Sequence, residues 1–208
     1  KIKAFQAKGG LVVGDDRLTP AIKPDIVLAP TQRSGRNDRD KAALLSLAAE
    51  LRKKLDPRVA RYLDSSNPEA IPYLRRLQNT DYVFLVNDRR EYGQYVGQHG
   101  LVMENGLPSS TQVRIARPAG FVYDLVRGEP VAAKAEGGSL RLDLELGPCD
   151  GTVLMVTPQA IDRVSVNAPE VVARGGKAQV DIAVLDAQGR PIEAVTPLQV
   201  SIRDASGR

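Results

Sequence analysis

Hydrophobic positions near the start of the chain follow the pattern of an α/β unit. Ile2 and Phe5 lie three residues apart and would share one face of a short helix. The apolar runs "LVV" (11–13) and "IVL" (26–28) are typical of strands buried on both faces, as in parallel sheets with crossover helices. They predict a partial α/β domain, Rossmann-like or flavodoxin-like. Open sheets of this type usually have about five or six strands, so we expect the chain to be a piece of a longer protein.

Helical spacing is clearest further along the chain. In "DKAALLSLAAELRKKLDP" (40–57), leucine and alanine recur every three or four positions, which predicts a helix. The segment "VARYLDSS" (59–66) is typical of a strand. The segment "SSNPEAIPYLRRLQ" (65–78) predicts a second helix, with Asn67 as its N-cap and Pro68 at the first helical position.

From residue 81 the hydrophobic period changes to two. The clearest example is "SLRLDLELGP" (139–148), whose leucines fall on one face of a strand while the charged residues fall on the other. The predicted core-facing leucines are Leu140, Leu142, Leu144 and Leu146. Consecutive half-buried strands with Gly and Pro turns between them predict an antiparallel β-sandwich over residues 81–158.

A third unit is expected over residues 159–208. The segments "IDRVSVNAP", "KAQVDIAVLDAQGRP" and "LQVSIRDASGR" predict three or four strands, fewer than the roughly seven of an immunoglobulin-like sandwich. The predicted fold class is therefore an α+β multidomain chain. It comprises a partial α/β domain (1–80), an antiparallel β-sandwich (81–158) and a partial immunoglobulin-like β-sandwich (159–208).

Composition narrows the classes of function. Hydrophobic residues make up 42% of the 208 residues, enough for packed cores, yet no apolar run approaches the roughly 18 residues of a membrane helix. The net charge is only +4, and there are six tyrosines, three phenylalanines and no tryptophan. We therefore expect neither membrane insertion nor a nucleic-acid groove. A single cysteine, Cys149, excludes an internal disulfide and a cysteine-based zinc site.

Two kinds of catalytic group can be considered. A nucleophilic cysteine needs a tight strand-to-helix turn and a nearby histidine, but Cys149 lies in the turn "LGPCDG" and His99 in a distant loop. Asp15 and Asp16 follow a predicted strand, but neighbours on a strand point to opposite faces, so a loop or helix-cap role is favoured over a carboxylate pair. Neither a phosphate-binding glycine loop nor metal-ligand spacing appears, so no catalytic residue, metal or cofactor is predicted.

The connection from 88 to 106 is the unusual stretch of the sequence. It is long for a hairpin loop, and long ordered loops are often functional. Aromatic rings stack on sugars and guanidinium groups donate hydrogen bonds to hydroxyls, so the loop could contact carbohydrate. Equally, its rings could pack against a neighbouring domain. The candidate contact residues are Arg89, Arg90, Tyr92, Tyr95 and His99.

Three segments together carry a resemblance: "DYVFLVND", "FVYDLVRGEPV" and "LRLDLELGPCDGTVLMVTP". They resemble the small C-terminal β-domain of bacterial glycoside hydrolases, with its strand ending in Asn, its "DL-x-x-G-x-x-V" hairpin and its last strand pair "L-x-L-x-P-x-x-G-x-x-L". The α/β part before them is similar to the amidotransferase-like domain of barrel-type β-galactosidases. The matching positions are Asn87, Asp124, Leu125, Gly128, Val131, Pro148 and Gly151.

The resemblance implies a domain order and a role. In that family a catalytic (β/α)8 barrel, which would precede Lys1, carries both catalytic glutamates. The amidotransferase-like domain is non-catalytic and mediates oligomerisation. The chain is therefore expected to be a non-catalytic accessory or oligomerisation region of a carbohydrate-active enzyme. Its expected partners are other domains of the same polypeptide, further copies of the chain and carbohydrate.

A second class of function stays open. The immunoglobulin-like unit would also suit a structural or adhesive multidomain surface protein. The sequence does not determine the compartment, although an extracellular or periplasmic location is favoured.

Overall fold

Two compact units make up the computed structural model, which describes residues 1–15, 17, 21–30, 34–96 and 101–203. The first unit contains residues 1–61 and 90–107, and the second contains residues 62–89 and 108–208. The elements of the first unit are α1 (Ile2–Ala7), β1 (Val13–Gly14), β2 (Ile26–Val27), α2 (Asn37–Leu55), β6 (Arg90–Val96) and β7 (Leu101–Gly106). The chain thus leaves the first unit after residue 61 and returns to it for the β6–β7 hairpin.

The first unit contains the two predicted parallel strands, which follow α1. Val13 pairs with Ile26 and Gly14 with Val27. The Asp25 carboxylate holds this start together by accepting hydrogen bonds from the Val12 N–H (2.8 Å) and the Gln6 side-chain amide (3.0 Å). The predicted helix over 40–57 is confirmed as α2, which begins three residues earlier. With two strands described here, the Rossmann-like or flavodoxin-like topology stays a prediction.

Residues 90–96 and 101–106 pair as an antiparallel hairpin, so the prediction of a long loop is wrong. Arg90 pairs with Gly106 and Tyr92 with Glu104, and the register shifts between Tyr92 and Tyr95. The segment "REYGQYV" is rich in Tyr and Val, which suit a strand. Its glycine and the register shift hide the alternation that would have marked it in the sequence.

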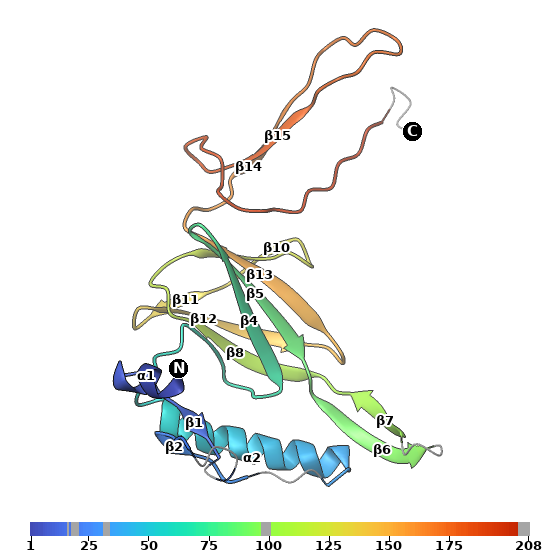
Figure 1. Ribbon diagram of the computed structural model, residues 1–208. Coiled ribbons are helices and arrows are strands. Elements are labelled where there is room, and N and C mark those ends of the chain that lie inside the picture. Colours follow the sequence, from blue (N-terminus) through green and yellow to red (C-terminus); the bar gives the residue numbers. More distant parts are fainter. Residues whose placement is uncertain (16, 18–20, 31–33, 97–100, 204–208) are drawn as a thin grey trace. The chain divides into compact units, whose positions relative to one another are not determined.

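The second unit contains the predicted antiparallel β-sandwich (Figure 1). One sheet has the strand order β10-β9-β13-β5-β4 and the other has the order β11-β12-β8-β3, and every pair is antiparallel. The strands are β3 (Leu63–Ser65), β4 (Ala70–Leu77), β5 (Thr80–Asn87), β8 (Ser109–Ile115), β9 (Phe121–Asp124), β10 (Glu129–Val131), β11 (Lys134–Glu136), β12 (Ser139–Leu146) and β13 (Gly151–Thr157).

Between the sheets lies one hydrophobic core. It draws Val83 and Leu85 from β5, Val113 and Ile115 from β8, and Leu154 from β13, all at most 1% exposed. On β12 the leucines face inward as predicted: Leu140, Leu142 and Leu146 are buried and Leu144 packs against the core, whereas Asp143 and Glu145 are exposed. Period-two alternation is therefore what assembles the sandwich.

Strand β4 replaces the helix predicted over 65–78. Asn67 does cap the segment, but its side-chain oxygen accepts the Glu69 N–H (2.9 Å) and its carbonyl accepts the Ala70 N–H (3.1 Å), so it closes a turn. β4 then pairs with β5 along its whole length. The predicted domain boundary near residue 80 falls inside this hairpin.

Pro72 is compatible with β4 because β4 is the edge strand of its sheet. The Asp88 N–H bonds the Glu69 carbonyl (2.7 Å), which fixes the register. Odd-numbered residues of β4 therefore bond to β5, and even-numbered ones, Pro72 among them, turn their backbone groups toward the free edge.

A two-stranded antiparallel ribbon follows the sandwich, made of β14 (Arg163–Asn167) and β15 (Asp181–Leu185). Opposite residues share a face, so Val164 with Val184 and Val166 with Ile182 form one apolar side. The Asp186 carboxylate closes the following turn by accepting the N–H groups of Gln188 (3.0 Å) and Arg190 (2.8 Å). The immunoglobulin-like identity of this part stays a prediction.

Candidate functional site

Two of the predicted contact residues, Arg90 and Tyr92, come together on the β6–β7 hairpin. The Arg90 guanidinium forms an ion pair with Glu104 (2.7 Å), and its carbon lies 6.0 Å from the centre of the Tyr92 ring. Tyr92 and Glu104 are paired across the hairpin, which explains why one cation reaches both. Both members of the ion pair are about one-third exposed, so this cluster is accessible to a partner.

The other three predicted contact residues do not join this cluster in the described structure. Arg89 belongs to the second unit, where its guanidinium donates to the Pro108 carbonyl (2.8 Å) and its N–H to the Asn87 side chain (3.1 Å). Tyr95 is described only as a backbone position of β6. His99 lies outside the described residues.

Cys149 and Asp15, the described candidates for a catalytic role, both lie in turns. Cys149 is exposed and has a φ of 55°, in the left-handed region that tight turns require. The Asp15 carboxylate accepts the Arg17 N–H (2.8 Å), which is a local turn contact. Asp16 lies outside the described residues. Asp15 also lines an open depression at the carboxyl ends of β1 and β2, together with Val13, Leu28, Pro30 and Leu47.

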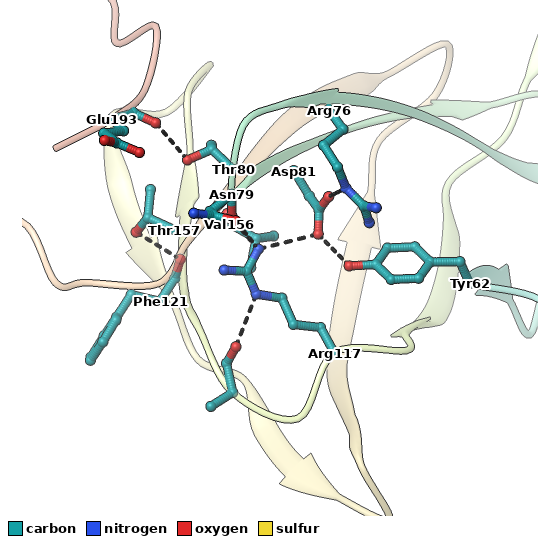
Figure 2. A network of polar contacts seen from close by, with 11 residues as sticks. Tyr62, Arg76, Asn79, Thr80, Asp81, Arg117, Phe121, Val156, Thr157 and Glu193 are labelled. Atoms are coloured by element: carbon teal, nitrogen blue, oxygen red, sulfur yellow. Dashed lines mark hydrogen bonds and ion pairs between the residues drawn. The ribbon is translucent and has the colours of Figure 1, made fainter.

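The most developed polar constellation lies inside the sandwich, around Asp81 at the start of β5 (Figure 2). The Asp81 side chain is fully buried. One of its oxygens accepts the Tyr62 hydroxyl (2.5 Å) and an Arg117 N–H (3.3 Å), and the other accepts Arg76 Nε (2.7 Å). Two guanidinium groups and a phenol thus compensate one buried carboxylate.

Arg117 links this network to the surrounding loops. Its guanidinium also donates to the carbonyl groups of Asn79 (2.8 Å), Ala119 (3.0 Å) and Val156 (3.3 Å). These carbonyls belong to the β4–β5 turn, the β8–β9 connection and β13, so a single side chain joins three segments that are distant in sequence. With its donors engaged in this way, Arg117 has a structural role.

The environment shifts two pKa values in the network. Burial raises the pKa of the Tyr62 phenol, and its hydrogen bond to Asp81 raises it further. The hydrogen bond to Asp81 also raises the pKa of Arg76, whose guanidinium carbon lies 4.5 Å from the centre of the Tyr62 ring. Both shifts hold the protons in place, so the network does not present a group poised for acid–base chemistry.

A second polar cluster gathers several residues of the glycoside-hydrolase-like motifs. Buried Asn87, the last residue of β5, donates to the Gly147 carbonyl (2.7 Å) and accepts the Ser109 hydroxyl (2.9 Å). Its N–H bonds the Asp150 carbonyl (2.9 Å). Asn87 therefore ties the end of β5 to the start of β8 and to the β12–β13 turn.

Asp124, also from those motifs, organises the β9–β10 turn. Its carboxylate accepts the N–H groups of Val126 and Arg127 (2.9 Å each) and pairs with the Arg127 guanidinium (2.7 Å). Burial of Asp124 raises its pKa, but these hydrogen bonds outweigh burial and bring the pKa below its ordinary value. Gly128 ends the turn with a φ of 71°, which explains the glycine at this position.

Arg127 connects the two motif turns, because its guanidinium also reaches Asp150 (3.4 Å). Gly151, next to Asp150, lies so close to β5 that a Cβ there would be 3.0 Å from the Leu85 carbonyl oxygen. Four motif residues spread over 87–151 thus converge on one end of the sandwich, and Asn87, Asp124, Gly128 and Gly151 each have a structural reason for their identity.

Sequence reasoning missed the Asp81 network, although a signal was present. In "TDYVFLVN", Asp81, Val83 and Leu85 alternate and must share one face of the strand. A carboxylate on the same strand face as core residues requires buried hydrogen-bond or ion-pair partners. The arginines and tyrosines nearby in the sequence were candidates for these partners.

Two broader features concern metals and membranes. Among the residues that the structure describes, no three His, Cys, Asp or Glu side chains gather in a way that could hold a metal ion. No helix in the described ranges is long and apolar enough to cross a membrane.

Comparisons with protein-family models and with curated proteins give no match. Among solved structures, the chain is similar to alpha-L-fucosidase isoenzyme 2 from Paenibacillus thiaminolyticus, with 18% identity and a TM-score of 0.41. The similarity covers 57% of this chain and 19% of that one, so the chain spans about a fifth of the enzyme's length. At this level the likeness carries no argument about function.

Proposed function

We propose that this chain is a non-catalytic accessory region of a β-galactosidase-like, carbohydrate-active enzyme whose catalytic barrel lies upstream in the same polypeptide. The observation that supports this most directly is the convergence of Asn87, Asp124, Gly128 and Gly151 on one end of the sandwich. Residues that the motif resemblance selects from the sequence alone turn out to act together as a turn-locking cluster.

The polar chemistry of the sandwich fits an accessory role. The Asp81 carboxylate is fully buried and bonded to three side chains, and Asp124 is bonded to its own turn. Groups held in this way make a module rigid, and they leave contact with other molecules to its surface. On the first unit, the Arg90–Tyr92–Glu104 cluster offers a partly exposed ring beside an ion pair. Either a sugar or a neighbouring domain could cover that ring.

The coding sequence of the entire polypeptide provides the first test. The proposal expects a (β/α)8 barrel upstream of Lys1, with two glutamates at strand ends. The 208-residue chain alone should then be inactive on a panel of nitrophenyl glycosides, and the entire polypeptide should be active. An upstream region made only of immunoglobulin-like repeats would overturn the proposal and favour a structural or adhesive protein. Turnover by the 208-residue chain that disappears in Asp15→Asn would also overturn it.

The hairpin cluster has its own test. If the cluster contacts sugar, Tyr92→Ala should abolish oligosaccharide-induced NMR shifts in the chain. If it contacts a neighbouring domain, Tyr92→Ala should lower the thermal midpoint of the entire polypeptide but not that of the 208-residue chain. Glu91→Ala is the matched control, because Glu91 is exposed on the same strand and its side chain leaves the opposite face. Equal behaviour of the two variants in both assays would show that the cluster contacts neither sugar nor a domain.

A further inference from the structure

The solvent-facing side of the β4–β5 hairpin carries an apolar cluster of four side chains, here called the outer patch. Their exposed fractions are 49% for Ile71, 52% for Tyr73, 39% for Phe84 and 53% for Val86. Alternate residues of the same strands, such as Val83 and Leu85, are buried in the core. The sheet is therefore apolar on both faces here, which an isolated sandwich does not require.

Register makes the outer patch contiguous. Ile71 lies directly opposite Val86, and Tyr73 directly opposite Phe84. The Tyr73 and Phe84 rings are 6.4 Å apart with an interplanar angle of 53°. The Arg75 guanidinium carbon lies 4.7 Å from the centre of the Tyr73 ring. Paired aromatic and β-branched side chains on a strand surface are the kind of anchor that protein interfaces use.

The chain itself covers a neighbouring part of the same sheet. The Tyr82 hydroxyl accepts the Val195 N–H (2.5 Å) and donates to the Val195 carbonyl (3.2 Å), and the Thr196 hydroxyl donates to the sulfur of Met155 (3.9 Å). Tyr82 lies directly opposite Arg75, and on this face of the sheet their pair is next to the Tyr73–Phe84 pair. The covering by residues 195 and 196 therefore ends beside the outer patch.

The chemistry of the outer patch favours a protein over a sugar. A sugar site combines a ring face with polar groups that bond hydroxyls. Here Arg75 already lies against the Tyr73 ring, and the patch also contains Ile71 and Val86. A mixed aliphatic and aromatic surface is instead what a second sheet would cover, with strands within about 30° of alignment.

The charges at the two ends of the hairpin fit a second copy of the chain as the partner. Glu69 and Asp88 lie at the end where β4 begins and β5 finishes, and Arg75 lies beyond the other end of the outer patch. A surface with an apolar centre and opposite charges at its two ends is complementary to itself after a two-fold rotation. The acidic end of one copy then meets the basic end of the other.

We propose that the outer patch is a two-fold dimerisation surface, and that its partner is the outer patch of a second copy of this chain. The four side chains expose an area on the order of the 300–600 Å² typical of the largest patch on a monomer, less than the roughly 800 Å² per partner of a standard interface. The dimer is therefore weak and in equilibrium with the monomer. This pairing does not depend on whether a catalytic barrel is present.

Sedimentation velocity of the 208-residue chain, from about 1 to several hundred micromolar, tests the proposal. The weight-average mass should rise with concentration toward twice that of the monomer. Tyr73→Lys should weaken association by about tenfold or more, as loss of an interface anchor does. Val126→Lys is the matched control, because Val126 is 65% exposed but lies in the β9–β10 turn. If Tyr73→Lys does not fold, Val86→Lys takes its place.

A charge exchange tests the orientation. Arg75→Glu should weaken the dimer, and Arg75→Glu combined with Asp88→Arg should restore it, because the reversed charges meet again in the two-fold pair. A monomer at every concentration would overturn the proposal, as would equal weakening by Tyr73→Lys and Val126→Lys. Failure of the double exchange to restore association would also overturn it. Oligosaccharide-dependent NMR shifts of Tyr73 and Phe84 in a persistent monomer would assign the face to carbohydrate instead.

Discussion

Replacing Asp81 by alanine removes the acceptor at the centre of the sandwich network. Three donors lose their partner: the Tyr62 hydroxyl (2.5 Å), Arg76 Nε (2.7 Å) and an Arg117 N–H (3.3 Å). They differ in access to water, since the side chain of Arg76 is 51% exposed and that of Arg117 only 14%. Water can replace the carboxylate at Arg76, but much less so at Arg117.

The magnitude follows from these differences. Removing one partner of a buried ion pair costs about 3–5 kcal/mol, because the remaining charge stays buried without compensation. The half-exposed Arg76 contact is worth about 1 kcal/mol or less, since solvent screens it. The Tyr62 hydrogen bond to a charged acceptor is worth about 1.5–3 kcal/mol. Asp81→Ala should therefore lower the free energy of unfolding by about 3–5 kcal/mol, mainly through Arg117 and Tyr62.

Urea unfolding followed by far-UV circular dichroism measures this loss. With a slope of about 2 kcal/mol per molar urea, the midpoint should fall by about 1.5–2.5 M. Asp143→Ala is the matched control, because Asp143 is an exposed carboxylate on β12 of the same sandwich and its loss should cost less than about 0.5 kcal/mol. If the two variants have the same midpoint, the Asp81 network does not stabilise the fold and the reasoning fails.

Three further predictions use the same assay. Leu142→Ala should cost about 2–5 kcal/mol, because Leu142 is fully buried, and a midpoint equal to that of Asp143→Ala would contradict the assigned facing. Hydrogen bonds hold the pKa of Asp124 below its ordinary 3.8, so its contribution is present above about pH 4 and is lost as the pH falls further. Wild type should thus lose stability more steeply below pH 4 than Asp124→Asn, and parallel acid profiles would argue against this. Burial raises the pKa of Tyr62 above 10, so its contribution is present below about pH 10 and is lost above it. Stability should fall less above pH 10 in Tyr62→Phe than in wild type, and an equal decline would refute the shift.

The sandwich could be predicted because its strands obey one simple rule. In β12 every second residue is leucine, so one face must be buried, and that holds whatever the partner strands are. The same rule misleads where a turn residue precedes a strand. Asn67 and Pro68 are equally good at starting a helix and at closing a turn, and only the pairing of β4 with β5 selects the turn.

The candidate sites were harder to predict because they depend on tertiary neighbours. Tyr92 and Arg90 were both predicted as candidate contact residues, but their contact with each other depends on a hairpin register that a shift between Tyr92 and Tyr95 obscures. The Asp81 network joins Tyr62, Arg76 and Arg117, which come from different strands and loops. No local pattern links these positions, although the place of Asp81 on the core face of β5 indicates that it must have buried partners.

The discontinuity of the first unit has a consequence for the order of events during synthesis. Residues 1–61 leave the ribosome before residues 90–107, but their unit also needs that later segment, and α2 contacts β6 within it. At typical translation rates of about 5–20 residues per second, a few seconds pass between the synthesis of residues 1–61 and that of the hairpin. During this interval β4 and β5 are also emerging. The first unit can therefore be completed only after residues 62–89 of the second unit have been made.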